Sequence, residues 1–141
     1  MTISDLAGSW TYRSFINNPD MVDGDPQKAI DLFFAEAEFR FEAISDTGFK
    51  GVIDWGSGGL DLAGRINPGS ADMPTAFAIT GTGRQRSQTD GWEYDYNGCI
   101  GYRWPNGVKQ IPSLVGTVIR AKPHNGAPAG FTASFIAVKR P

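Results

Sequence analysis

Apolar and polar residues alternate with a period of two along most of the chain, as in strands that bury one face. The clearest example is FFAEAEFRFEAI at residues 33–44, in which four charged residues share the face opposite Phe39 and Phe41. A helix would scatter these phenylalanines around its circumference, because its period is 3.6 residues. The segment is therefore predicted to be a β-strand.

The same alternation predicts seven further strands, separated mostly by short segments rich in Gly, Pro, Asn, Asp and Ser. The eight predicted strands are Ser9–Ile16, Phe33–Ile44, Phe49–Trp55, Leu60–Asn67, Thr75–Arg84, Trp92–Arg103, Ser113–Lys122 and Phe131–Arg140. One short helix is predicted at Pro26–Leu32, because Asp25 can cap it and Pro26 suits the first helical position. This helix lies in the long connection from Asn17 to Leu32, which we expect to cover a binding site as a lid.

Short connections favour antiparallel pairing of successive strands, and about eight such strands can close into a barrel. We therefore predict an all-β fold: a closed up-and-down antiparallel barrel with one short helix in the first loop, in a single domain over residues 1–141. Glycines inside the strands, such as Gly98 and Gly116, suit the coiling of a small barrel. A β-sandwich is the alternative fold.

The amino-acid composition limits the kinds of partner that this barrel can bind. The chain has 13 basic and 15 acidic residues, so it lacks the basic surface of a nucleic-acid-binding protein. It has one cysteine, Cys99, and therefore no intrachain disulfide; we expect a buried, inert thiol. The N-terminal MTISDLAGSW lacks the features of a signal peptide, and no apolar run reaches about 20 residues. We expect a cytoplasmic protein that binds neither nucleic acid nor membrane.

Two short features resemble calycins, the group of β-barrels that includes lipocalins and avidins. Gly8-Ser9-Trp10 begins the first strand, and Lys139-Arg140 ends the last one. The resemblance implies that Trp10 plugs the closed end of the barrel, that Arg140 packs on its ring, and that Ser4–Leu6 forms a helical turn beneath it. The chain also resembles uncharacterised bacterial proteins with a streptavidin-like barrel, which implies a fold but no activity.

An aromatic segment, WEYDYNGCIGYRW at residues 92–104, supplies the candidate site. Trp92, Tyr94 and Tyr96 share a face with Ile100, Tyr102 and Trp104. Inward placement of this face leaves Glu93 and Asp95 in water, where carboxylates cost least. We predict a ligand pocket lined by Tyr12, Phe39, Phe41, Phe77, Trp92, Tyr94 and Tyr96. Alternatively, these aromatic residues fill the core or form a face between copies of the chain.

Other candidate chemistry is sparse. One histidine, His124, and one cysteine do not make a zinc site of the usual kind, and His124 is read as a turn residue. The acidic loop with Asp20, Asp23 and Asp25 lacks a bidentate glutamate for calcium. We therefore predict no metal and no cofactor. Arg65 and Arg103 are read as solvated outward positions, although an inward arginine would hold a ligand carboxylate.

These features predict non-catalytic binding of a small apolar or aromatic molecule inside the barrel. One alternative is a metal-free enzyme, because GWEYDY resembles a strand of lipocalin-like phenolic acid decarboxylases. That resemblance implies Tyr94 and Tyr96 as donors, Glu93 as acid and base, and Arg103 as carboxylate clamp. However, Glu93 and Tyr94 are adjacent and point to opposite faces of one strand. A third reading is a structural subunit that forms homo-oligomers through an outer face.

Overall fold

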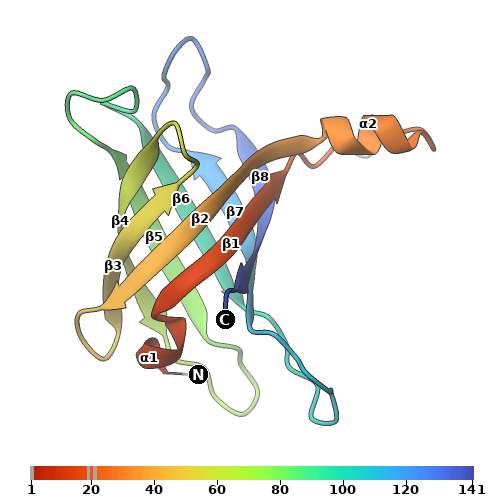
Figure 1. The fold of residues 1–141 in the computed structure, drawn as a ribbon, viewed down its shortest axis with the longest axis vertical. Coiled ribbons are helices and arrows are strands. Elements are labelled where there is room, and N and C mark those ends of the chain that lie inside the picture. The colour runs from red at the N-terminus through yellow and green to blue at the C-terminus, as the bar shows by residue number, and fades with distance from the viewer. Residues whose placement is uncertain (1, 19, 21) are drawn as a thin grey trace.

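The computed structural model describes residues 2–18, 20 and 22–141. They form a closed barrel in which each strand pairs antiparallel with the next and β1 also pairs with β8 (Figure 1). The strands are β1 (Gly8–Phe15), β2 (Phe33–Ala43), β3 (Gly48–Asp54), β4 (Gly59–Asn67), β5 (Ala76–Gly83), β6 (Glu93–Ile100), β7 (Ser113–Arg120) and β8 (Thr132–Lys139). The predicted all-β, up-and-down barrel is confirmed, and closure between β1 and β8 removes the sandwich alternative.

Two short helices flank β1. Helix α1 (Ile3–Leu6) lies below the closed end of the barrel, and α2 (Pro26–Asp31) lies in the predicted first loop (Figure 1). As predicted, Asp25 caps α2 by accepting a hydrogen bond from the amide of Gln27, and Pro26 is its first residue. No described helix has the length and apolar character needed to cross a lipid bilayer.

The expected lid over the open end is wrong for the described part of the first loop. Helix α2 projects away from the barrel, and none of its residues is buried (Figure 1). Ile30, its one large apolar side chain, is 65% exposed. A single apolar residue does not give a helix the apolar stripe that would hold it against the barrel.

The closed end is built on Trp10, which is completely buried. Its indole Nε1 donates a hydrogen bond to the carbonyl oxygen of Leu6 in α1, at 2.9 Å. Gly8, two residues earlier, has a φ of +117°, which residues with a side chain rarely adopt. The Gly-x-Trp motif therefore has a physical basis: the glycine turns the chain from α1 into β1, and the tryptophan fills the end of the barrel.

The cation over Trp10 is Lys139, and the prediction that Arg140 takes this place is wrong. The Lys139 ammonium lies 5.5 Å from the centre of the indole ring. Arg140 is exposed and forms an ion pair with Glu38. The reason is strand parity: Trp10 and Lys139 are directly paired across β1 and β8, so their side chains share a face, whereas the next residue points to the other.

Aromatic side chains pack the half of the barrel next to this plug. Phe39, Phe41 and Phe49 are buried, and their rings contact one another in sequence at centroid distances of 4.9 and 5.1 Å.

Gly98 and Gly116 allow β6 and β7 to approach closely. A Cβ at Gly98 would lie 2.0 Å from the carbonyl oxygen of Val115, and one at Gly116 would lie 2.1 Å from that of Asn97. Both glycines are thus required by the close backbone approach.

The sixth strand is shorter than predicted. β6 ends at Ile100, and residues 101–112 form a loop that extends from the closed end of the barrel (Figure 1). Tyr102 and Trp104 are 72% and 69% exposed on this loop, so the prediction that they share the inward face of Tyr94 is wrong. Pro105 and Pro112 lack amide hydrogens, which disfavours further strand pairing in this segment.

Candidate functional site

A cavity of about 520 Å³ opens at the end of the barrel opposite Trp10. Most of its lining is aromatic or aliphatic, which is typical of sites for small organic molecules. The lining residues are Tyr12, Ser14, Phe33, Phe34, Ala35, Glu36, Ala37, Ile53, Trp55, Leu60, Trp92, Tyr94, Tyr96 and Val118. The barrel therefore has a packed half next to Trp10 and a hollow half at its open end.

Four of the predicted pocket residues line this cavity: Tyr12, Trp92, Tyr94 and Tyr96. The last three reach it because alternate residues on and just before β6 point inward. Glu93, between Trp92 and Tyr94 in the sequence, lies on the outer face, where its carboxylate is 3.9 Å from the ammonium of Lys122.

Phe39, Phe41 and Phe77 do not line the cavity, and their prediction as pocket residues is wrong. All three point inward, but they belong to the packed half of the barrel, where they are 0%, 5% and 4% exposed. Their inward orientation follows from the alternation. Their depth in the barrel depends on how far each strand is shifted along the barrel axis. The alternation of apolar and polar residues contains no information about that shift.

Two tryptophan rings line the cavity near its open end, and a histidine ring stacks on one of them. The rings of Trp55 and Trp92 are nearly parallel, with centroids 6.1 Å apart. The imidazole of His124 stacks on Trp92 at a centroid distance of 3.7 Å and an angle of 14°. His124 sits in the connection between β7 and β8, where its backbone pairs with that of Ala127. The predicted turn residue thus also brings its side chain against Trp92, a residue that lines the cavity.

Arg120 is the buried cation of this region, with 9% of its surface exposed. Its Nε donates to the phenol oxygen of Tyr94 at 3.0 Å, and its Nη1 donates to the carbonyl oxygen of Pro128 at 3.2 Å. The guanidinium lies 5.1 Å from the ring centre of Phe131. No carboxylate of a described residue forms an ion pair with Arg120, so two neutral oxygens and aromatic faces hold this charge.

The Tyr94 phenol oxygen also lies 2.8 Å from Nε2 of His124. Arg120, Tyr94 and His124 therefore form a continuous hydrogen-bonded chain from β7 through β6 to the β7–β8 connection. Partial burial, together with the nearby positive charge of Arg120, lowers the pKa of His124 below its ordinary value. This chain ties the connection to the rim of the cavity.

Sequence reasoning missed Arg120 and selected Arg65 and Arg103 as the arginines to follow. Both side chains are exposed, as predicted for arginines that point outward into solvent. The signal for Arg120 was present, because it has the same parity on β7 as Leu114 and Val118, which are inward and buried. Alternation continued to the end of β7 places the Arg120 side chain on the inward face.

Tyr12 and Tyr96 carry hydroxyl groups at the inner end of the cavity, and Ser14 adds a third, one inward position nearer the open end on β1. Ser14 is 1% exposed, and its Oγ has no hydrogen-bond partner among the described residues. Tyr12 lies two residues earlier on the same face of β1, and Tyr96 packs against it with ring centroids 6.0 Å apart. Burial raises the pKa of both phenols well above the ordinary value for tyrosine. The neighbouring Ser14 hydroxyl opposes burial by lowering the pKa of Tyr12, although Ser14 Oγ lies outside hydrogen-bond geometry.

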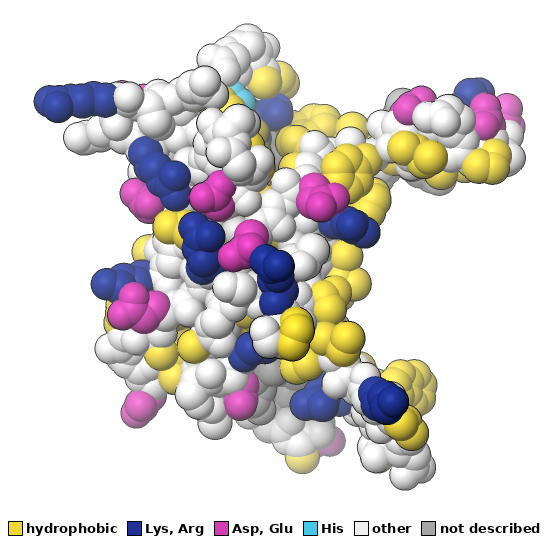
Figure 2. All heavy atoms as spheres, viewed as in Figure 1, with side chains coloured by type: hydrophobic (Ala, Val, Ile, Leu, Met, Phe, Trp, Pro, Cys, Tyr) yellow, Lys and Arg dark blue, Asp and Glu magenta, His cyan; other side chains and the backbone are white. Residues whose placement is uncertain are grey.

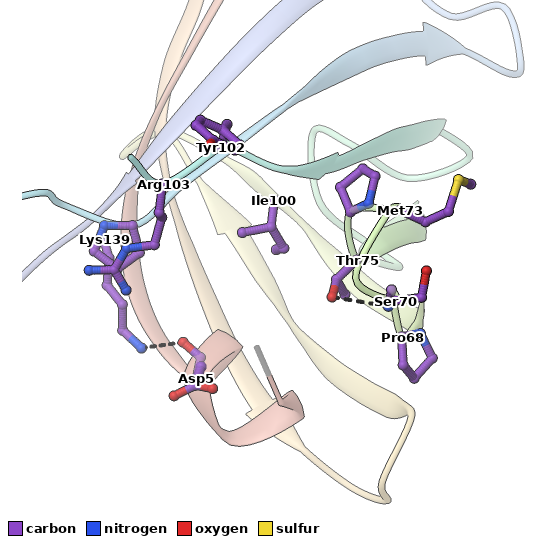
Figure 3. Close-up of a pocket in the computed structure, with 13 residues that line it drawn as sticks. Asp5, Pro68, Ser70, Met73, Thr75, Ile100, Tyr102, Arg103 and Lys139 are labelled. Atoms are coloured by element: carbon purple, nitrogen blue, oxygen red, sulfur yellow. Dashed lines mark hydrogen bonds between the residues drawn. The ribbon is translucent and has the colours of Figure 1, made fainter. Parts of the chain in front are cut away.

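A second cavity, of about 590 Å³, lies at the closed end, between α1, the β4–β5 connection and the loop after β6 (Figure 3). Two of its polar side chains are hydrogen-bonded within the protein. Thr75 accepts a hydrogen bond from the amide of Gly69, and the Lys139 ammonium donates to the carbonyl oxygen of Asp5. Arg103 also lines this cavity, so it lies at the opposite end of the barrel from Tyr94 and Tyr96.

The structure does not bring together the four residues implied by the decarboxylase resemblance. Tyr94 and Tyr96 line the open cavity, Glu93 lies outside the barrel and Arg103 at its closed end. Among the described residues, no three His, Cys, Asp or Glu side chains gather as a metal site would require. Cys99 is half-buried on β6 rather than fully buried.

Apolar side chains also occur on the outside of the barrel. Figure 2 shows them along the side below α2. Large apolar residues exposed on the barrel strands are Phe15, Phe33, Val115 and Ile136. Val115 and Ile136 are paired across β7 and β8, which makes them neighbours on the outer surface. This face is where the structural-subunit alternative would place contacts between copies.

Comparison of the chain with protein-family models, curated proteins and solved structures found no match in any of the three. The open cavity and the residues that line it are the features that bear on function.

Proposed function

We propose that this protein binds a small apolar or aromatic molecule in the open cavity and does not transform it. The observation that supports this most is the contrast between the two halves of one barrel interior. Phenylalanine and tryptophan fill the half near Trp10, whereas the other half leaves about 520 Å³ among aromatic and aliphatic side chains. A barrel of eight strands has an interior of the size that accommodates either side chains or one small ligand.

The lining favours a flat, largely uncharged ligand. Trp55, Trp92 and Tyr94 place aromatic rings around the cavity, and an apolar or aromatic ligand can pack against them. Of the described lining residues, only Glu36 carries a charge, and its carboxylate pairs with Arg13 at 3.3 Å on the exposed side of β1 and β2. Transfer of an apolar molecule from water into this lining is favourable by the hydrophobic effect.

We also propose that the barrel is a calycin-like one. The buried Trp10 follows Gly8, α1 lies beneath it, and a cation from the last strand lies over its ring. These are the arrangements that the resemblance of Gly8-Ser9-Trp10 implies, with Lys139 in place of Arg140. This likeness supports a class of fold only. The proposed ligand follows from the residues that line the cavity.

The test is a fluorescence titration with N-phenyl-1-naphthylamine, a neutral aromatic dye whose emission rises in apolar surroundings. We expect saturable binding to the wild-type protein. Ala37→Phe places a ring inside the cavity from β2, and Val118→Phe does so from β7, so both should weaken binding at least tenfold. Ala43→Phe, the same substitution at an exposed position of β2, is the matched control and should leave binding unchanged.

Other results would favour the alternatives. Failure of the wild-type protein to bind the dye, together with a concentration-dependent increase in mass by sedimentation, would support the structural subunit. Equal binding by wild type, Ala37→Phe and Val118→Phe would place the dye outside the barrel. Turnover of a phenolic acid that is abolished by Tyr94→Phe would support the enzyme.

A further inference from the structure

The hydroxyl groups at the inner end of the cavity are the polar feature that packing does not explain. Ser14 Oγ is buried without a partner among the described residues, which is unfavourable relative to a hydrogen-bonded hydroxyl. No hydrogen bond joins the phenol oxygens of Tyr12 or Tyr96 to another described residue, whereas that of Tyr94 is bound by Arg120 and His124. Polar groups left open inside an apolar cavity indicate where a ligand supplies the missing partner.

We propose that Ser14, Tyr12 and Tyr96 bind one neutral oxygen of the ligand, a hydroxyl or a carbonyl, at the inner end of the cavity. This proposal rests on the proposed binding function and names the chemical class of the ligand. The three residues come from β1 and β6, and all line the cavity while being only 1–3% exposed. An aromatic or apolar body would then lie between this end and the stacked rings of Trp55 and Trp92.

Charge decides between a neutral group and an ion. The described lining residues include no arginine, lysine or histidine that could pair with a carboxylate at the inner end. Their one carboxylate, Glu36, is more than half exposed and paired with Arg13 outside the barrel, so it does not balance a buried ammonium group. An ion at the inner end would lose its hydration without gaining an opposite charge, which is strongly unfavourable.

Arg120 marks the other end of the cavity. Its guanidinium contacts Tyr94 and Pro128 near the rim, and it is absent from the lining. An anionic ligand would therefore orient its charge toward the rim and leave the inner hydroxyls without a role. The two orientations can be distinguished by substitutions at opposite ends of one cavity.

The test measures displacement of bound N-phenyl-1-naphthylamine by three compounds with the same ring system: naphthalene, 2-naphthol and 2-naphthoate. For the wild-type protein, we expect 2-naphthol to bind about 3- to 10-fold more tightly than naphthalene, the value of about one hydrogen bond. 2-Naphthoate should bind more weakly than 2-naphthol. Ser14→Ala and Tyr96→Phe should each reduce the preference for 2-naphthol over naphthalene toward one, without weakening naphthalene more than twofold.

Two matched controls accompany these variants. Ser9→Ala changes a serine on the outer face of β1, and Tyr102→Phe removes a phenol from the exposed loop after β6; both should retain the full preference. Far-UV circular dichroism establishes that each variant is folded, and the two inner-end variants test the same proposal independently.

Three outcomes would overturn the inference. The first is an unchanged preference for 2-naphthol in both Ser14→Ala and Tyr96→Phe, which would leave the binding function intact. The second is tighter binding of 2-naphthoate than of 2-naphthol that is lost in Arg120→Met, which would place an anion at the rim. The third is absence of dye binding to the wild-type protein, which would remove the binding function and this inference together.

Discussion

The phenol oxygen of Tyr94 lies 2.8 Å from Nε2 of His124, although thirty residues separate them in the chain. The same oxygen accepts a hydrogen bond from Nε of Arg120 at 3.0 Å, so the Tyr94 hydroxyl can donate its proton to a neutral imidazole. Nδ1 of His124 is buried and has no partner among the described residues. This hydrogen bond therefore holds the connection between β7 and β8 beside the cavity, and the lowered pKa of His124 favours its neutral imidazole.

This arrangement predicts a pH dependence of stability. Partial burial and the charge of Arg120 lower the pKa of His124 in the folded protein, so the unfolded chain binds the proton more readily. The stabilising effect is present above about pH 6.5, the ordinary histidine pKa, and is lost as the pH falls toward the lower folded value. We expect the urea midpoint of the wild-type protein to decrease between pH 7.5 and 5.5. The decrease should be smaller in His124→Gln, and equal slopes for the two proteins would contradict this.

Arg120→Met should destabilise the protein, because it removes two hydrogen bonds of a buried guanidinium and leaves the Tyr94 and Pro128 oxygens without that donor. Hydrogen bonds to charged groups each contribute about 1.5–3 kcal/mol, so a loss of at least about 1.5 kcal/mol is expected. Arg65→Met is the matched control on the exposed face of β4 and should change stability by less than about 0.5 kcal/mol. Urea unfolding measures the free energy of unfolding of both variants. Equal losses would show that the hydrogen bonds of Arg120 do not stabilise the fold.

Trp10→Ala should reduce the free energy of unfolding by about 3–5 kcal/mol, as truncation of a large buried aromatic residue does. Trp10 is fully buried and carries the hydrogen bond to Leu6 that holds α1 beneath the barrel. Trp104→Ala makes the same change at a position that is 69% exposed and should cost little. Chemical denaturation followed by far-UV circular dichroism measures both variants. A small effect at Trp10 would contradict its role as the plug.

Gly98→Ala should destabilise the barrel by about 1–3 kcal/mol through overpacking. The added methyl group would lie 2.0 Å from the carbonyl oxygen of Val115, so β6 and β7 would have to move apart. Asn97→Ala, one residue earlier on the exposed face, is the control and should be nearly neutral. Thermal denaturation compares the two; a neutral Gly98→Ala would mean that the strands can separate at little cost.

Much of the barrel could be predicted from the sequence, because the side-chain period of a strand is local. The alternation at Phe39 and Phe41 and at Tyr94 and Tyr96 assigns an inward face without any tertiary information. Short connections then favour antiparallel neighbours, and Gly8-Ser9-Trp10 marks the closed end. The same local reasoning placed Tyr12, Trp92, Tyr94 and Tyr96 on the interior, and all four line the cavity.

Local alternation is therefore enough to predict which side of each strand faces inward. The depth of each inward residue needs the folded barrel, because it depends on the shift between strands around the barrel. That shift places Phe77 in the packed half and Ser14 at the cavity, and it brings Arg120 beside Tyr94. It also selects Lys139 over Arg140 to cover Trp10, because direct pairing across β1 and β8 sets which of two adjacent cations points inward.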